Sequence, residues 1–221
     1  MNEKDVLYED NHLIIVNKRS GEIVQVDDTK DIPLIDKVKA FLKKKHNKQG
    51  NVFLETVHRL DRPVSGAIIF AKTSKALPRL NKMFQDKKVQ KTYWALTLRH
   101  PPQKFALLQD YLLKDRSRNV TKAYKKQVKE AKFSELEYTF LKDVKGKSLL
   151  EINPLTGRPH QIRVQLASIG CIIKGDLKYG APEPNPDKSI CLHSRHVSFI
   201  HPVSKEKISV TAPIHHDNLW Q

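Results

Sequence analysis

The sequence has too few cysteines and too few long apolar runs for several common classes of protein. Its two cysteines, Cys171 and Cys191, cannot form a disulfide framework or a zinc site of paired cysteines. No run of 18 apolar residues occurs, and the charged first ten residues lack the apolar stretch of a secretory signal. These absences indicate a reduced, cytoplasmic protein with no membrane partner.

The sequence motifs of several enzyme classes are also missing. The chain contains no GxxxxGK[ST], GxGxxG or GxSxG pattern. It therefore lacks the motifs that bind nucleotide cofactors and the motif that carries the nucleophile of serine hydrolases. His193 and His196 stand three residues apart in a strand-like segment, which points them to opposite faces. We therefore expect no metal site.

Positive charge, by contrast, is abundant. Forty Lys and Arg residues against 24 Asp and Glu residues give a formal net charge of +16. A surplus of this size attracts polyanions, so we expect a nucleic-acid partner. Between positions 114 and 147, eleven basic residues against five acidic ones accompany strand-like stretches, which predicts a basic hairpin or sheet. Charge alone distinguishes neither DNA from RNA nor a binding protein from an enzyme.

The hydrophobic pattern predicts an α+β fold. At 221 residues with 39% hydrophobic content, the chain is long enough for one substantial core. We expect one helix from Leu34, a second capped by Ser74, and a third over residues 159–169 that Gly170 closes. Strands are expected at 6–8, 12–17, 66–71, 90–98, 120–126, 135–141, 149–153, 171–173, 190–199 and 207–211. Regular strand–helix alternation, the mark of a doubly wound sheet, is absent.

The densest group of polar residues is VHRLDRPVSG at positions 57–66. Asp61 stands between Arg59 and Arg62, in a turn that Pro63 and Gly66 make rigid. The flanking cations favour an ionised carboxylate, available as a nucleophile or base. Taken alone, the local sequence favours the plainer interpretation, a structural ion pair at a strand entrance.

A second group is LTGRPHQIR at positions 155–163. The free amides of a helix start beside Arg158 suit a phosphate or a carboxylate. Arg163 lies at the border of the apolar face and requires a buried partner, for which Asp61 is a candidate. The alternative makes Arg158 a solvated cap residue and turns Arg163 outward.

Two aromatic residues, Tyr93 and Trp94, occupy opposite faces of one expected strand. One is expected in the core, and the other is available to stack on a base. A lone aromatic residue in a strand more often belongs to the core, so this signal is weak by itself.

Taken together, these segments resemble the RluA-type family of pseudouridine synthases. The resemblance covers nearly the whole chain, through residues 6–18, 58–73, 91–96, 149–180 and 191–203. Its most specific part is HRLDxxxSG followed about a hundred residues later by TGRxHQIR. The implied fold is a mixed, largely antiparallel sheet with packed helices and a central basic cleft. We expect one catalytic domain over 1–221, without the N-terminal RNA-binding domain that many relatives carry.

The resemblance also implies residue roles, and it overturns the plainer interpretation of Asp61. Asp61 becomes the catalytic residue, Arg59 helps to displace the target base, Tyr93 stacks on the flipped uracil, and Arg163 pairs with Asp61. The residues expected to contact substrate RNA are Arg59, His58, Arg62, Arg158, His160, Lys18, Lys125 and Lys126.

The sequence departs from the family pattern at three positions. Arg19 replaces the proline of NKPxG, which predicts a less rigid loop, while Val64 and Gln165 replace a common Thr and a frequent His. None of the three is Asp61, Tyr93 or Arg163. We therefore expect the departures to affect substrate choice more than activity.

The expected function is isomerisation of specific uridines in ribosomal or transfer RNA after base flipping. Nothing is oxidised and no group is added, so no cofactor or metal is expected, and we expect a monomer. Attack of Asp61 on C1′, its addition to C6 and abstraction of the 2′-proton all remain open. Two alternatives stand beside this function: a non-catalytic RNA-binding or ribosome-assembly protein, and a hydrolase that uses Asp61 with His58 or His160.

Overall fold

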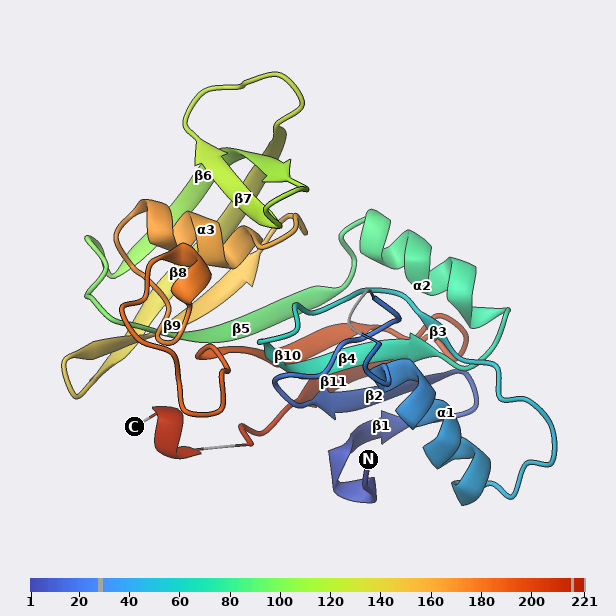
Figure 1. The fold of residues 1–221 in the computed structure, drawn as a ribbon. Helices are drawn as coiled ribbons and strands as arrows, with labels where there is room; N and C mark the ends of the chain where they lie inside the picture. The colour runs from blue at the N-terminus through green and yellow to red at the C-terminus, as the bar shows by residue number, and fades with distance from the viewer. Residues whose placement is uncertain (28–29, 216, 221) are drawn as a thin grey trace. The chain divides into compact units, whose positions relative to one another are not determined.

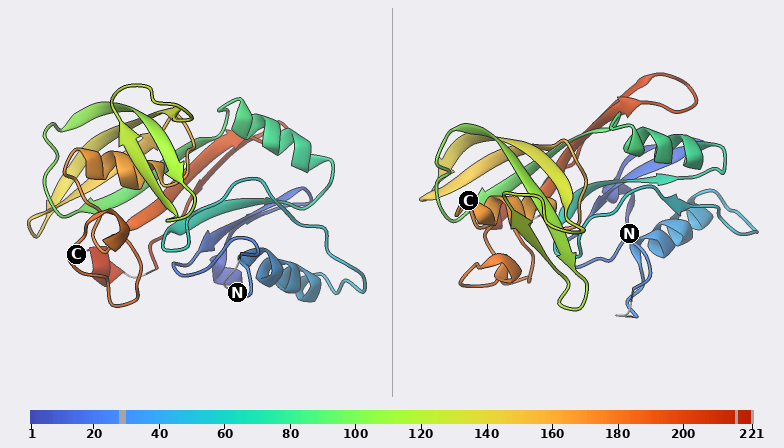
Figure 2. Two further views of the ribbon diagram at one scale, coloured as in Figure 1. Left: turned by 45° about the horizontal axis from the view of Figure 1, so that its top comes forward. Right: turned by 90° about the horizontal axis from the view of Figure 1, so that it is seen from above.

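The computed structural model describes residues 1–27, 30–215 and 217–220, which form two compact units. Unit 1 comprises Met1–Lys91 and Ser194–His215, and unit 2 comprises Thr92–His193 with residues 217–220. The chain enters unit 2 within strand β5 (Gln90–Thr97) and returns to unit 1 within strand β10 (Leu192–Ile200), as Figures 1 and 2 show.

Unit 1 is built on β-strands. Its strands are β1 (Val6–Glu9), β2 (Leu13–Lys18), β3 (Glu55–Thr56), β4 (Ser65–Ala71), the main part of β10, and β11 (Lys207–Thr211). The order is β1-β2-β4-β10, with β3 also pairing with β4 and β11 also pairing with β10. The pairs β1–β2, β2–β4, β3–β4 and β10–β11 are antiparallel. Helices α1 (Leu34–Lys45) and α2 (Ala76–Gln85) belong to the same unit, and a short 3-10 helix (Glu3–Asp5) precedes β1.

The core of unit 1 explains why β2 and β4 are apolar on both faces. Leu13 and Ile15 of β2 pack with Ile69 of β4 and with Ala76 and Leu80 of α2. The alternate side chains of β2 point to the opposite face, where they are buried as well. A strand buried on both sides reads as a continuous apolar run, which is why LIIV and GAIIFA predict strands so clearly.

In unit 2 the strands of the sheet pair antiparallel, in the order β5-β9-β8-β6-β7. Its further strands are β6 (Phe105–Asp115), β7 (Val120–Tyr124), β8 (Lys132–Val144) and β9 (Lys147–Pro154). Helix α3 (Gln161–Ser168) packs against β6 and β7 on one face of this sheet (Figure 1). Short 3-10 helices follow at Leu177–Tyr179 and Asp217–Trp220.

The structure confirms the α+β class and most of the predicted elements. The two strands predicted in the basic segment, β7 and β8, belong to the sheet of unit 2, but they do not form a hairpin with each other because β6 lies between them. Two details were wrong. The amide of Ala76 at the start of α2 donates to the Thr73 hydroxyl (3.2 Å), so Thr73 and not Ser74 is the capping residue. Residues 171–173 form no strand, because Ile173 makes only an isolated bridge to Thr97.

The eleven-residue strand β6 was missed. Its paired leucines, at 107–108 and 112–113, hide the alternation that marks a half-buried strand. The basic cleft and the single-domain organisation stay predictions. None of the helices described here combines the length and the apolar character that a membrane span requires.

Candidate active site

Asp61 lies in a tight turn at the entrance of β4. The amide of Val64 donates to the carbonyl oxygen of Asp61 (3.0 Å), which closes the turn. Leu60 and Val64 on either side are buried, whereas Asp61 itself is only partly buried. The two apolar neighbours therefore anchor the turn and hold the carboxylate at a fixed place on unit 1.

The ammonium group of Lys18 lies inside unit 1, directly against the same turn. Its side chain is fully buried, and Nζ donates to the carbonyl oxygens of Val64 (2.6 Å), Arg62 (3.1 Å) and Arg19 (3.0 Å). Burial lowers the pKa of Lys18 to about 7, although the carboxylates of Glu22 and Asp61 act in the opposite direction. This position corrects the expectation that Lys18 binds RNA, because an ammonium enclosed by three carbonyl groups is not presented to a phosphate.

The segment after Lys18 completes the support of the turn. The amide of Gly21 donates to the carbonyl oxygen of Arg62 (2.8 Å), and the Ser20 hydroxyl donates to that of Pro63 (3.0 Å). With Lys18, these bonds tie the end of β2 and the loop after it to residues 62–64. The Asp61 turn is thus fixed from a segment more than forty residues earlier in the chain.

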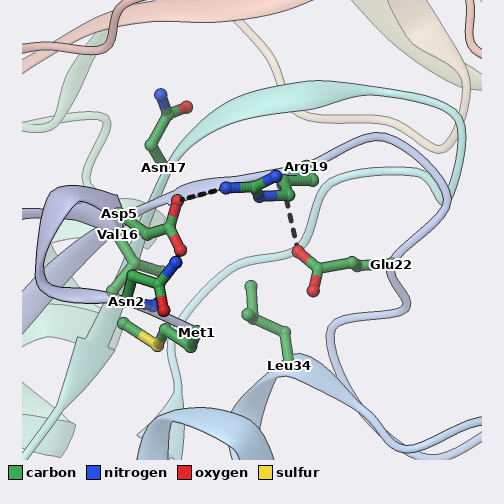
Figure 3. A pocket seen from close by; sticks show the side chains of 8 residues that line it. All are labelled: Met1, Asn2, Asp5, Val16, Asn17, Arg19, Glu22 and Leu34. Atoms are coloured by element: carbon green, nitrogen blue, oxygen red, sulfur yellow. Dashed lines mark hydrogen bonds and ion pairs between the residues drawn. The ribbon is translucent and has the colours of Figure 1, made fainter. Parts of the chain in front are cut away.

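Arg19 is restrained by contacts of its own. Its side chain pairs with Asp5 (3.2 Å), and its amide donates to the Glu22 carboxylate (3.0 Å) at a cavity of about 200 Å³ shown in Figure 3. Burial opposes ionisation of Asp5, but bonds from the Asn2 amide and Arg19 leave the pKa of this carboxyl lowered. These bonds restrain a loop that was expected to be less rigid without the usual proline.

His58 connects the segment that carries Asp61 to strand β4. Its Nε2 accepts a hydrogen bond from the Ile69 amide (2.9 Å), at the point where the short strand β3 no longer pairs. Its ring stacks on Phe84, with centroids 4.7 Å apart. Burial, together with the charge of Lys91, lowers the pKa of His58 to about 3. A neutral ring with Nε2 occupied disfavours His58 as a hydrolase base, and its contact with RNA stays a prediction.

The two arginines beside Asp61 are exposed. Arg62 forms an ion pair with Asp31 (2.6 Å), and both side chains are about half exposed. Arg59 is also on the surface. Both side chains are therefore accessible to RNA, and their contact with it stays a prediction.

Gly66 sets the close approach of β4 to β10. Its φ of 114° lies in a region that side chains rarely adopt, and a Cβ there would overlap the backbone of Ser194. Only glycine fits where this turn enters the sheet.

In unit 2, Arg163 of α3 is held by a partner that the sequence analysis missed. Nε donates to Oδ2 of Asp176 (2.7 Å), and Nη2 donates to Oδ1 (2.7 Å). Both side chains are almost fully buried, and the guanidinium carbon lies 5.0 Å from the centre of the Tyr179 ring. This paired and stacked arrangement fixes the guanidinium rigidly. The contact of Arg163 with Asp61, which belongs to unit 1, stays a prediction.

His160 and Tyr179 connect α3 to the β6–β7 hairpin. Nδ1 of His160 lies 2.8 Å from the Tyr179 hydroxyl, and its Nε2 lies 3.3 Å from the Lys114 ammonium. The Tyr179 hydroxyl also accepts the Thr121 amide (2.9 Å). His160 adopts a left-handed backbone (φ 54°) at the cap of α3. These contacts give His160 a structural role. Its expected contact with RNA stays a prediction.

Gln161 organises the residues before α3. Its Oε1 accepts the amide of Arg158 (2.9 Å) and the Thr156 hydroxyl (2.8 Å), and its Nε2 donates to the Glu135 carbonyl oxygen (2.9 Å). The Arg158 amide is therefore already used, which removes one of the donors expected for a phosphate. Nε of Arg158 donates to the carbonyl oxygen of Phe133 (3.1 Å).

The remaining predicted residues of unit 2 differ in their surroundings. Tyr93 lies on β5 opposite Ile152 of β9 and is nearly buried. Lys126 is exposed. Lys125 is also exposed, but its ammonium lies 2.7 Å from the buried carboxylate of Asp110. The other oxygen of Asp110 accepts Nε2 of Gln165 (2.8 Å), so the unusual Gln165 belongs to the packing of α3 on β6.

A family model described as RNA pseudouridylate synthase matches residues 12–168, which contain both the Asp61 turn and the Arg163 segment. The chain belongs to the RNA pseudouridylate synthase family. This confirms the predicted family and enzyme class, an RNA pseudouridine synthase. The residue roles stay predictions.

Related proteins of the family act on two classes of RNA by name. The chain is 32% identical to ribosomal large subunit pseudouridine synthase C of Vibrio cholerae, over 96% of this chain and 66% of the relative. The protein of the same name from Buchnera aphidicola is 35% identical, with 95% and 67% covered. The tRNA pseudouridine synthase C of Haemophilus influenzae is 31% identical, with 98% and 95% covered. The chain thus spans about two thirds of the ribosomal relatives and nearly all of the tRNA relative.

Solved structures show the same fold. Human RNA Pseudouridylate Synthase Domain Containing 4 matches with a TM-score of 0.81 at 21% identity, over 98% of this chain and 90% of that one. Human RNA Pseudouridylate Synthase Domain Containing 1 gives 0.74 at 20% identity, over 97% and 86%. The α+β fold of this pseudouridine synthase is therefore that of its family.

Proposed function

We propose that this pseudouridine synthase isomerises specific uridines of ribosomal or transfer RNA, with Asp61 as the catalytic carboxylate. The family match over residues 12–168 carries the proposal. The turn of Asp61 adds support, because a buried ammonium and two loop bonds hold it in place. Such a restraint suits a group that must meet a substrate atom in one geometry.

The reaction is an internal exchange of bonds. The N1–C1′ bond breaks, the uracil turns, and a C5–C1′ bond forms. C5 loses its hydrogen as a proton and N1 gains a proton, so the reaction needs no oxidant and no external group. A carboxylate placed at the junction of sugar and base can attack C1′, add to C6 or remove the 2′-proton.

The other residues have roles in binding and orientation. The target nucleotide must leave its stack, which costs a few kcal/mol in an RNA helix. Arg59, exposed beside Asp61, is proposed to occupy the space that the base leaves. Tyr93 is proposed to stack on the uracil, which returns about 1–3 kcal/mol. Arg163, already fixed by Asp176, is proposed to supply a rigid positive charge to the reacting carboxylate.

Release of tritium from RNA labelled with [5-³H]uridine tests this proposal, because only bonding at C5 expels that hydrogen. Wild-type protein should release tritium from ribosomal or transfer RNA transcripts, and Asp61→Asn should release none while it still binds RNA. Asp36→Asn is the matched control, since it changes an exposed carboxylate of the same unit. Turnover by Asp61→Asn would remove Asp61 from its role. RNA binding without turnover by wild type would favour a non-catalytic RNA-binding protein.

The class of RNA is tested separately. Pseudouridine maps of ribosomal and transfer RNA from cells with and without the gene should differ at defined uridines. Sites lost from only one class identify the substrate. Unchanged maps in both classes would contradict the proposed substrates.

A further inference from the structure

Three aromatic side chains form one row on the face of the unit 2 sheet opposite α3. Tyr111 of β6 pairs directly with Tyr124 of β7 on one side and with Phe133 of β8 on the other. Directly paired residues of antiparallel strands share a face, so Tyr124, Tyr111 and Phe133 lie side by side. We call these three residues the aromatic row.

The alternation of β6 and β7 places the row away from the helix. On the α3 side, Asp110 contacts Gln165 of α3, and Thr121 bonds to the carbonyl oxygen of Pro159 just before α3. Tyr111 follows Asp110 by one residue, and Tyr124 follows Thr121 by three, so both point to the opposite face. The row is therefore separate from the packing of the helix that carries Arg163.

The row is accessible. Phe133 is 42% exposed, and Tyr111 and Tyr124 are partly exposed. The rings of Tyr111 and Phe133 meet edge to face, with centroids 5.7 Å apart and planes inclined at 66°. This mutual contact fixes the rings, but it leaves much of Phe133 uncovered. Fixed, exposed aromatic rings can accept the flat face of a base.

The loop that adjoins the row is basic, whereas Glu135 lies two residues from Phe133 on the same face of β8. The loop between β7 and β8 covers residues 125–131, and Lys132 and Phe133 are the first two residues of β8 (Figure 1). Over residues 125–132, one acidic residue, Glu130, accompanies four lysines: Lys125, Lys126, Lys129 and Lys132. Arg158 adds a guanidinium that bonds to the Phe133 backbone. Exposed aromatic rings bordered by basic residues are the combination that binds single-stranded nucleic acid.

We propose that the aromatic row stacks bases of a single-stranded segment of the RNA substrate, while the lysines of the adjoining loop contact its phosphates. This inference rests on the proposed function, since it assigns the row to the same RNA. It adds a second contact region, on the face of the unit 2 sheet that α3 leaves uncovered. Stacking is tolerant of base identity, so this region contributes affinity and not the choice of uridine.

Binding of a fluorescently labelled twelve-residue oligoadenylate tests the row, because an RNA without uridine has no target base for the catalytic residues. Phe133→Leu and Tyr124→Leu keep apolar side chains but remove the rings, and each should weaken binding at least fivefold. Phe105→Leu is the matched control. Phe105 lies on the same face and is 56% exposed, but it is six residues from Tyr111 along β6, and it should bind as wild type.

A second measurement avoids the variants altogether. Oligoadenylate containing 2-aminopurine should lose fluorescence on binding wild-type protein, because stacking on an aromatic ring quenches that base. Wild-type affinity in both ring variants, or binding without quenching, would overturn the proposal and leave the row as a surface for a protein partner. Tritium release is measured in parallel. If binding depends on the rings but no tritium is released, the row is supported as an RNA-binding surface and the proposed reaction is contradicted. If tritium is released but binding does not depend on the rings, the proposed reaction is supported and the role of the row is contradicted.

Discussion

The Nζ atom of Lys18 lies 2.6 Å from the carbonyl oxygen of Val64, so the last residue of β2 holds the turn that presents Asp61. A buried lysine at the end of an apolar strand here supports the turn that carries Asp61. Its three acceptors are all backbone carbonyl groups, which makes the support independent of the side chains of the turn.

Replacement of Lys18 by methionine should destabilise the protein and reduce turnover. The substitution keeps the volume but leaves three carbonyl groups without their donor, at an expected cost of about 2–4 kcal/mol in the free energy of unfolding. Lys37→Met is the control, because it removes a partly exposed ion pair with Glu22 and should cost less than about 1 kcal/mol. Urea unfolding and tritium release check both. Equal stability of the two variants would contradict the role of Lys18.

His58 predicts a specific sensitivity to acid. Its pKa is about 3 in the folded protein against an ordinary 6.5, so between these values the unfolded chain binds a proton that the folded chain does not. The free energy of unfolding should therefore fall as the pH drops from 6.5 towards 3. His58→Gln should lose this part of the fall, whereas His196→Gln, a histidine bonded to Ser209, should keep it. Matching acid curves for wild type and His58→Gln would rule out this origin.

Asp176→Asn should disturb unit 2 at the buried ion pair. An unpaired guanidinium in the interior costs about 3–5 kcal/mol, and Arg163 loses its bidentate restraint. Thermal unfolding should show a large loss, while Asp143→Asn, which removes a half-exposed pair with His100, should change little.

A double variant separates structure from chemistry at this pair. Arg163→Met with Asp176→Leu removes both charges, so it should recover much of the stability but not the tritium release. Recovered turnover in the double variant would contradict a role for the guanidinium in the reaction.

Gly66→Ala should be far more harmful than an alanine elsewhere in unit 1. The added Cβ overlaps the backbone of Ser194 and the φ of 114° is strained for alanine, so we expect a loss of more than about 2 kcal/mol. Gly50→Ala is the control, since a Cβ there meets nothing within 4 Å. Its effect should stay within about 0.5 kcal/mol. Chemical denaturation of both variants provides the comparison.

The elements that could be predicted from the sequence are those with one dominant physical signal. Strands β2 and β4 are continuous apolar runs bounded by turn residues, and α3 ends at Gly170 with a positive φ. β6 could not be found, because its leucine pairs obscure the two-residue period. Ser74 is a good capping residue by type, but the adjacent Thr73 has the hydroxyl that reaches the helix amide.

The candidate site was predictable in its motifs but not in its supporting contacts. Asp61 and Arg163 stand in distinctive segments, whereas Asp176 is a lone acidic residue in a loop and carries no signal of a buried partner. For Lys18 the sequence did contain such a signal. Lys18 follows Ile14 and Val16 at a spacing of two residues, so it lies on the same buried face of β2. Its charge argued for the surface, and packing against backbone carbonyl groups outweighed that preference.

The lysines of the loop after β7 are unequal because of Asp110. Lys125 forms an ion pair with the Asp110 carboxylate, which is 1% exposed. A phosphate that recruited Lys125 would leave a negative charge without its counter-ion in the interior of unit 2, and this penalty would offset the attraction between the lysine and the phosphate. Lys126 and Lys129 have no such carboxylate among the ion pairs described for this loop. Electrostatic capture of RNA thus depends on the lysines that the fold does not already use.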